Sequence, residues 1–250
     1  MIPKVIHYCW FGGNPLPKLA KKCIKSWKKY CPDYKIIEWN ESNLDIENSP
    51  LYIRQAHEAK KYGFVPDYFR AKIIFEYGGI YLDTDVQIIK SLDSLLLNKA
   101  FFGFENLNNI NLGHGFGGEK GLPVFKEIMD QYLDIKFINN DGTYNMLPSP
   151  QINTKVFLNH GLKLNNQEQL LDEYIKIYPI DYFCPKSFRT GELHKTKNTY
   201  SIHHFDASWF SKDGKKWLKK DRKKIKNRKI IKAIIGERLF ENLKKFFKHN

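Results

Sequence analysis

The chain of 250 residues is long enough to bury a substantial core, so we expect one α/β domain with a small appendage. An apolar fraction of 42% and an aromatic fraction of 15% argue against disorder. No apolar run approaches the roughly 18 residues that a membrane-spanning helix needs. Of the net charge of +14, most lies at one end: residues 211–250 hold 16 Lys and Arg against 4 Asp and Glu, and residues 1–210 hold 25 against 23. The basicity belongs to a tail.

The N-terminal stretch MIPKVIHYCWFGG has a short apolar run and no small-residue cleavage site, so it is not typical of a secretory signal. The cysteines at positions 9, 23, 31 and 184 show neither C-x-x-C spacing nor the density of a disulfide scaffold. We therefore expect reduced, partly buried thiols, no zinc, and a cytoplasmic protein.

Strand-like and helix-like runs alternate along the chain. The expected strands are 2–10, 35–39, a pair of short strands within 80–89, 100–104 and 174–178. The expected helices are 17–27, 51–62, 66–75, 121–133 and 150–158. This alternation predicts an open, mostly parallel sheet flanked by helices, with ligands at the carboxyl ends of the strands.

The segment YGGIYLDTDV, residues 77–86, places Asp83 and Asp85 one residue apart after an apolar run. In an extended segment these side chains point to the same side. Carboxylate oxygens suit Mg²⁺ or Mn²⁺, which also bind substrate phosphates and stabilise a departing diphosphate. A D-x-D arises by chance about once in a chain of this length, so the pair alone proves little.

Asp67 and Arg70 are three residues apart at the start of a helix and share one face. Taken alone, they would be an ordinary surface ion pair. Followed by YGGIYLDTD, however, this D-x-x-R resembles the DXD glycosyltransferases of the sugar-binding-region family, which includes fungal initiating mannosyltransferases, capsular polysaccharide enzymes and, more distantly, the large glucosylating toxins. IPKVIHYCWFGG resembles the N-terminal strand of that family, and SIHHFDASW, residues 201–209, resembles its closing motif.

The resemblance implies a GT-A fold over residues 1–210, followed by a basic amphipathic helical tail over 211–250. It implies metal-dependent, retaining transfer of a sugar from a nucleotide-diphosphate donor to a glycan acceptor, in capsular or other surface polysaccharide synthesis. No single nucleophile stands out in the sequence, which agrees with same-face internal return in retaining enzymes of this type, so no covalent residue is expected. The catalytic residues carried over are Asp83, Asp85 and Arg70.

The donor-binding residues that the resemblance implies are Trp10, Asp67, Arg70, Tyr81, Asp83, Ser208 and Trp209. Trp10 would stack on the base, although it is also a candidate core residue. Asp67 would accept hydrogen bonds from sugar or ribose hydroxyls, and Arg70 would donate to sugar or phosphate oxygens. Ser208 and Trp209 would contact the diphosphate and seal the donor from water.

The metal ligands that the resemblance implies, for Mn²⁺ or Mg²⁺, are Asp85 directly and Asp83 more weakly. His203 is the expected third ligand, and His204 is its alternative because neighbouring side chains on a strand point to opposite faces. A hydrogen-bonded core histidine is the competing interpretation of either.

The middle of the chain fits the family pattern less well. The stretch NLGHGFGGEKGLP, residues 111–123, is expected to form a sheet edge near the transferred sugar. In LPSPQINTKVF, Ser149 stands where relatives carry the glycine of a Gly-Pro helix start, which leaves the acceptor side open.

The expected partners are a nucleotide sugar, with UDP favoured over GDP, and a glycan or lipid-linked glycan acceptor. The basic tail either binds an anionic membrane surface, on the inner face of the cytoplasmic membrane, or packs on the domain. No nucleic acid is expected, since the tail lacks an aromatic or glycine-rich reading surface. Two alternative functions remain: a haloacid-dehalogenase-type phosphatase, and a non-enzymatic basic protein that binds membrane or nucleic acid.

Overall fold

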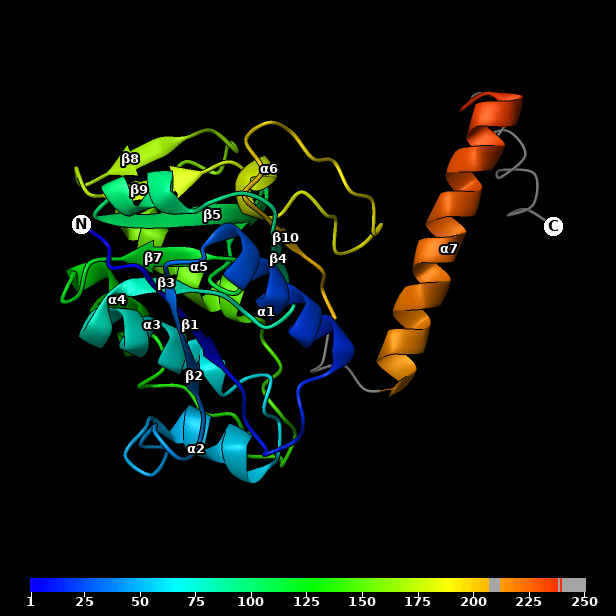
Figure 1. Cartoon of the computed structure of the whole chain (residues 1–250). Coiled ribbons are helices and arrows are strands. Elements are labelled where there is room, and N and C mark those ends of the chain that lie inside the picture. Colours follow the sequence, from blue (N-terminus) through cyan, green and yellow to red (C-terminus); the bar gives the residue numbers. More distant parts are fainter. Residues whose placement is uncertain (207–211, 238, 240–250) are drawn as a thin grey trace. The chain divides into compact units, whose positions relative to one another are not determined.

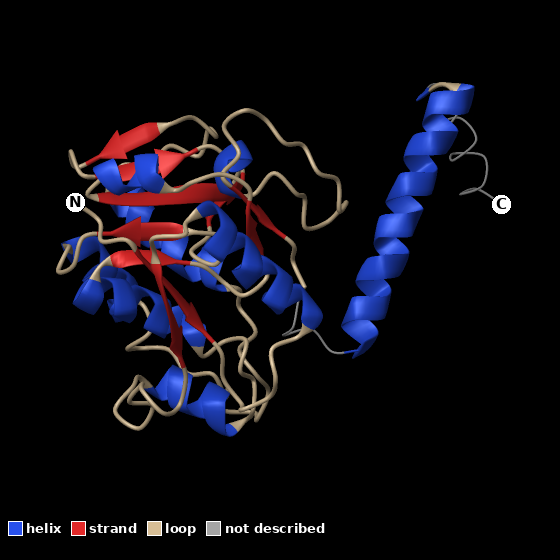
Figure 2. Cartoon of the chain, viewed as in Figure 1, coloured by secondary structure: helices blue, strands red, loops and turns tan. Residues whose placement is uncertain are grey.

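The computed structural model describes residues 1–206, 212–237 and 239, in which strands and helices alternate (Figures 1 and 2). The strands are β1 (Val5–Cys9), β2 (Lys35–Trp39), β3 (Gly79–Tyr81), β4 (Val86–Ile88), β5 (Ala100–Asn106), β6 (Asn109–Ile110), β7 (Phe116–Gly118), β8 (Gln169–Leu171), β9 (Ile175–Tyr178) and β10 (Ser201–His203). The helices are α1 (Lys18–Tyr30), α2 (Leu51–Glu58), α3 (Pro66–Tyr77), the 3₁₀ helix η1 (Asp93–Leu97), α4 (Pro123–Asp130), α5 (Ser149–Asn159), α6 (Ile180–Phe183) and α7 (Lys212–Ile235).

The described residues form two compact units. The first holds residues 1–186 and the segment that begins at residue 194, and the second holds residues 187–193 and the described residues from 212 onward. The predicted boundary at residue 210 stays a prediction.

The central sheet of the first unit has the strand order β2-β1-β3-β7-β5-β9-β8, and β6 pairs with β5. Strand β1 is parallel to both β2 and β3, and β5 is parallel to β9. Strand β7 is antiparallel to both β3 and β5, so β3 and β5 run in the same direction. The strands β1, β2, β3, β5 and β9 are therefore all parallel. The open, largely parallel sheet expected from the sequence is confirmed. A second, two-stranded sheet pairs β10 with β4 in antiparallel orientation.

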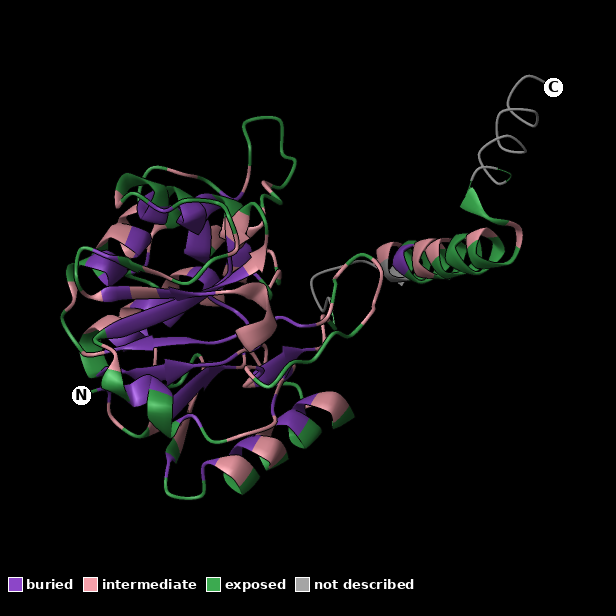
Figure 3. Ribbon diagram, turned by 90° about the horizontal axis from the view of Figure 1, so that it is seen from above, coloured by how far each residue is buried: buried purple, intermediate pink, exposed green. Residues whose placement is uncertain are grey.

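The sheet lies between two apolar clusters because successive side chains of a strand point to opposite faces. On β5, Phe102 joins the larger cluster with residues of α2 to α5, whereas Phe101 joins the smaller one with Trp27 of α1. Figure 3 shows the buried strands and the helices that carry exposed residues around them. All four cysteines are buried and unpaired, as the sequence predicts.

A tight corner connects α3 to β3 and positions the DXD segment. The amide of Gly78 donates to the carbonyl of Ile74, and Gly78 (φ 66°) and Gly79 (φ 109°) both occupy the left-handed region. A side chain at Gly79 would lie 2.9 Å from Nε2 of His7. Nε2 of His7 lies 2.9 Å from the Gly78 carbonyl, and Nδ1 accepts from Trp39 at 3.0 Å. The buried histidine therefore links three elements of the sheet edge.

Helix α2 and the glycine-rich stretch 111–123 differ from what the sequence predicts. Helix α2 ends at Glu58 rather than near residue 62, because Lys60 takes a left-handed φ of 55°. The stretch expected to form a sheet edge instead supplies β7, an internal strand between β3 and β5. A Cβ at Gly117 would lie 2.6 Å from the carbonyl oxygen of Gly79, so only glycine permits this close pairing of β7 with β3. Because glycine has a low strand propensity, the sequence did not predict an internal strand here.

In the second unit, α7 is attached to residues 187–193. The Arg222 guanidinium donates to the Phe188 carbonyl at 2.7 and 3.2 Å, and the Lys229 ammonium lies 2.6 Å from Glu192. The expected basic helix is therefore present, although its apolar positions 243, 246 and 247 lie outside the described residues. Within the described ranges, no helix combines the length and apolarity needed to cross a bilayer.

Candidate active site

Several of the predicted site residues lie where β1 and β3 end. These parallel strands pair His7 with Tyr81, and the amide of Leu82 donates to the His7 carbonyl at 3.0 Å, which extends the pairing beyond β3. Trp10 directly follows β1 and Asp83 follows β3 by two residues. Both therefore lie at the same carboxyl edge of the sheet, where open α/β sheets bind their ligands.

Asp83 and Asp85 lie in a turn rather than in an extended segment, which corrects the geometry assumed from the sequence. The amide of Val86 donates to the Asp83 carbonyl at 3.0 Å. The turn leads into β4, whose Val86 pairs with His203 of β10. One ligand atom from each of Asp83, Asp85 and His203 lies within 4.8 Å of the other two. The turn and the strand pairing together bring the acids and the imidazole to one point.

The Asp85 carboxylate is held on both oxygens. Nε2 of His203 lies 3.2 Å from Oδ1, and the amide of Asp206 donates to Oδ2 at 2.8 Å. Burial alone would raise the pKa of Asp85, but His203 and the Asp206 amide outweigh it and lower the pKa to about 2. Asp85 is therefore ionised at neutral pH.

The structure brings His203, not His204, to the acids. Nδ1 of His203 is buried and has no hydrogen-bond partner among the described residues. Burial lowers the pKa of His203, but Asp85, Asp83 and Glu105 together raise it by more, so the net shift is upward. His204 lies 3.0 Å from the Gln87 side chain through Nε2, and its backbone amide donates to the Asp85 carbonyl at 3.0 Å.

Arg70 forms a buried bridge between two acids. Its Nη2 lies 3.0 Å from Oδ1 of Asp67 and 3.4 Å from Oδ1 of Asp83, and its side chain is only 5% exposed. The guanidinium carbon lies 5.5 Å from the ring centre of Tyr81, which is itself buried. Burial raises the pKa of the Asp67 carboxyl to about 6, because its effect is larger than the lowering effect of the Arg70 charge. The pair expected on the surface is thus part of the domain interior, and Tyr81 packs against Arg70.

Sequence reasoning missed several residues around Asp83. Its amide donates to the Gly113 carbonyl at 2.9 Å, and a Cβ at Gly113 would lie 2.2 Å from its Oδ2. The Asn111 side chain accepts from the Gly113 amide at 2.5 Å and donates to Glu105. The only signal was the glycine-rich composition of this stretch. Ser149, noted for a missing glycine, hydrogen-bonds to Asp67.

The remaining predicted donor-binding residues differ in how the structure places them. Trp10 is partly exposed, and its Nε1 donates to the Asn14 carbonyl at 2.5 Å. Ser208 and Trp209 lie outside the described residues.

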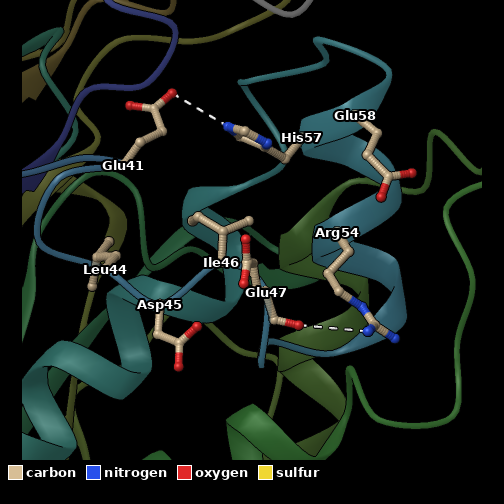
Figure 4. A pocket seen from close by; sticks show the side chains of 8 residues that line it. All are labelled: Glu41, Leu44, Asp45, Ile46, Glu47, Arg54, His57 and Glu58. Carbon is tan, nitrogen blue, oxygen red and sulfur yellow. Dashed lines mark hydrogen bonds and ion pairs between the residues drawn. The ribbon is translucent and has the colours of Figure 1, made fainter.

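A separate open pocket of about 570 Å³ lies between α2 and the loop before it (Figure 4). Its lining residues are Glu41, Leu44, Asp45, Ile46, Glu47, Arg54, His57 and Glu58. Glu41 accepts from the Gly12 amide at 2.7 Å and lies 3.3 Å from Nε2 of His57. None of the residues predicted for donor or metal binding lines this pocket.

The largely parallel α/β sheet, with a D-x-D turn at its carboxyl edge and His203 of β10 beside that turn, has the GT-A type of fold that the sequence resemblance implies. The PaToxG glycosyltransferase has the same kind of fold, with a TM-score of 0.52 over 63% of this chain and 69% of its own and 20% sequence identity.

Residues 17–102 match the family model described as a glycosyltransferase sugar-binding region containing a DXD motif. An uncharacterised glycosyltransferase of Acanthamoeba polyphaga mimivirus is 30% identical over 84% of both chains. The chain belongs to this DXD glycosyltransferase family. Inositol phosphoceramide mannosyltransferase 3 of Schizosaccharomyces pombe is 30% identical over 51% of the chain, and the chain spans only 36% of that relative. Family membership decides against the dehalogenase-type phosphatase.

Proposed function

We propose that this protein transfers a sugar from a nucleotide-diphosphate sugar to a glycan acceptor, with retention of the anomeric configuration. The observation that carries the proposal is the convergence of Asp83, Asp85 and His203 within 4.8 Å, beside Arg70 at the carboxyl edge of the sheet. A non-enzymatic role would not require an ionised, partly buried carboxylate such as Asp85 at this edge.

The donor set fits a divalent cation. Two carboxylates and an imidazole suit Mn²⁺, and Mg²⁺ is the alternative because it prefers oxygen ligands. Asp85 and His203 would hold the ion, with Asp83 as a weaker ligand. The bound ion would act as a Lewis acid that stabilises the negative charge of the departing diphosphate.

The side chains of the chain itself bind and orient the donor. The partly exposed Trp10 offers a flat surface for the base. Arg70 keeps its charge at any physiological pH and donates to phosphate or sugar oxygens, while Asp67 accepts from sugar hydroxyls. Tyr81 supports the Arg70 guanidinium, and we retain Ser208 and Trp209 as the residues that exclude water. No side chain is assigned as a covalent nucleophile.

The donor and acceptor follow from the resemblance and the relatives. We favour a UDP sugar, and the mannosyltransferase name of the fungal relative makes GDP-mannose the first alternative. We propose a surface glycan, such as a capsular polysaccharide or its lipid-linked precursor, as acceptor. A lipid-linked acceptor would place the protein at the inner face of the cytoplasmic membrane, where the basic residues 211–250 would contact anionic lipid.

The test is incubation of the purified full chain with UDP and GDP sugars, with Mn²⁺ or with a chelator, followed by chromatography of free nucleotide. We expect metal-dependent release of UDP or GDP from one donor. A thermal-shift screen with the same ligands provides an independent readout, because a ligand that binds only the folded state raises the melting temperature. The proposal would be overturned if no donor gave nucleotide release and no donor raised the melting temperature.

A further inference from the structure

Helix α1 carries a strip of lysines. Its 13 residues, KLAKKCIKSWKKY, include no acidic residue. The exposed lysines are Lys18, Lys21, Lys22, Lys25, Lys28 and Lys29. At 100° per residue all six fall within an arc of about 120°, and they extend along about 17 Å of the helix. We call these six residues the α1 lysine strip.

The opposite side of α1 fixes the strip to the domain. Trp27 is fully buried, and its Nε1 donates to the carbonyl of Val86, the residue after Asp85, at 2.7 Å. The amide of Ile88 donates to Ser26 Oγ at 3.0 Å. Trp27 also packs in the apolar cluster with Val86 and Ile88. The strip therefore faces away from the sheet on a helix that is bonded to the strand following the DXD turn.

The near-neutral charge of residues 1–210 conceals a strong separation of charge. Residues 1–37 hold eight lysines and one aspartate, whereas residues 38–58 hold five acidic residues and one arginine. No ion pair joins a lysine of the strip to any residue that the structure describes. Six like charges on one face repel one another, so the strip does not stabilise the isolated domain.

We propose that the α1 lysine strip binds the anionic surface of a phospholipid bilayer. A straight row of charges on a rigid helix is complementary to a plane of lipid phosphates, and each lysine near such a surface contributes about 1 kcal/mol. The strip contains no apolar side chain to insert, so the contact is electrostatic and weakens with salt. One aromatic ring lies at the end of the strip, where Lys29 Nζ is 5.1 Å from the ring centre of the partly exposed Tyr30. A single ring offers little area for stacked bases, which disfavours nucleic acid as the partner.

This surface is distinct from the basic α7, which belongs to the other unit, and it does not depend on the sugar chemistry. The experiment uses the full chain in three forms: wild type, Lys21→Ala/Lys25→Ala/Lys28→Ala, and the matched α7 variant Lys219→Ala/Lys223→Ala/Lys226→Ala. Each is sedimented with phosphatidylcholine vesicles with and without phosphatidylglycerol, at low and high salt.

We expect the wild type to bind only the vesicles that contain phosphatidylglycerol, and only at low salt. Loss of three strip lysines should weaken that partitioning about a hundredfold. The proposal would be overturned if the α1 variant bound these vesicles as strongly as the wild type does, or if the wild type did not bind them at all. Stronger strip-dependent binding to a short RNA or DNA duplex than to vesicles would overturn it in favour of nucleic acid.

Nucleotide-sugar hydrolysis without vesicles keeps this test separate from the proposed function. The three strip lysines do not belong to the donor or metal site, so the α1 variant should hydrolyse donor at the wild-type rate and show the wild-type circular dichroism spectrum. A chain that lacks transferase activity but binds vesicles through the strip would overturn only the proposed function.

Discussion

Two regions of the molecule combine one histidine with two carboxylates, yet only one of them is suited to a metal. In the active site, atoms of Asp83, Asp85 and His203 converge within 4.8 Å. In the second group, Nε2 of His160 lies 2.8 Å from Glu127, and Nδ1 bonds to Asp172.

The ring geometry explains the difference. The two nitrogens of an imidazole point away from each other, so Glu127 and Asp172 lie on opposite sides of the ring and cannot share one ion with it. They are also 41% and 53% exposed, whereas Asp85 is 16% exposed. Both groups thus contain one histidine and two carboxylates. Convergence and lower exposure separate a candidate metal site from a structural clamp between α4, the end of α5 and the turn after β8.

The largest effect should come from exchanging one acid in each group. Asp85→Asn removes the ionised carboxylate, and we expect donor turnover to fall about a hundredfold or more, since a Lewis acid contributes several kcal/mol. The matched exchange Asp172→Asn should leave turnover within about twofold of wild type. Nucleotide release at saturating donor and Mn²⁺ measures both. Wild-type turnover in Asp85→Asn would remove the assigned metal role.

The second prediction concerns the buried bridge of the active site. Arg70→Met leaves Asp67 buried without its partner, so we expect the free energy of unfolding to fall by about 3–5 kcal/mol in urea titrations. The double variant Asp67→Asn/Arg70→Met should recover part of that loss, because no carboxylate then remains unpaired there. If the double variant is as unstable as the sum of the two single variants, Asp67 and Arg70 do not act as a pair.

The third prediction uses pH to examine the clamp. Burial lowers the pKa of His160, but the hydrogen bonds that its ring donates to Asp172 and Glu127 raise the pKa above its usual 6.5. The stabilisation is therefore fully present below pH 6.5 and is lost as the pH rises through the raised pKa. We expect His160→Gln to be less stable than wild type at pH 6 by about 1 kcal/mol, with a smaller difference at pH 9. Thermal melts without metal at both pH values measure this stability difference. A difference that does not change with pH would contradict the prediction.

The smallest effect is expected in the pocket of Figure 4, which also holds acids and a histidine. Glu47→Gln/Glu58→Gln should change the free energy of unfolding by no more than about 0.5 kcal/mol and leave turnover unchanged, as for surface positions without a special role. A loss of activity would place this pocket in the active site. Glu41 is excluded from the exchange because it holds the Gly12 amide.

Local patterns in the sequence were sufficient for much of the fold. Apolar periodicity and the Gly78–Gly79 stop predicted the main helices and strands, because these features act over a few residues. The D-x-x-R and D-x-D motifs marked Asp67, Arg70, Asp83 and Asp85 for the same reason. The resemblance to the family also favoured His203 over His204, and the structure places His203 beside the acids.

Only the tertiary structure decided what depends on pairing between distant segments. It placed the glycine-rich β7 inside the sheet and brought Gly113 against Asp83. It also buried an ion pair that the helix pattern alone would leave on the surface. It also showed that the lysines of α1 form one face with no ion pair to the residues that the structure describes, which a charge sum over 210 residues conceals. Sequence specifies the local backbone and the chemistry of each side chain. Which carboxylates meet, and which are buried, follows from how strands far apart in the chain pair.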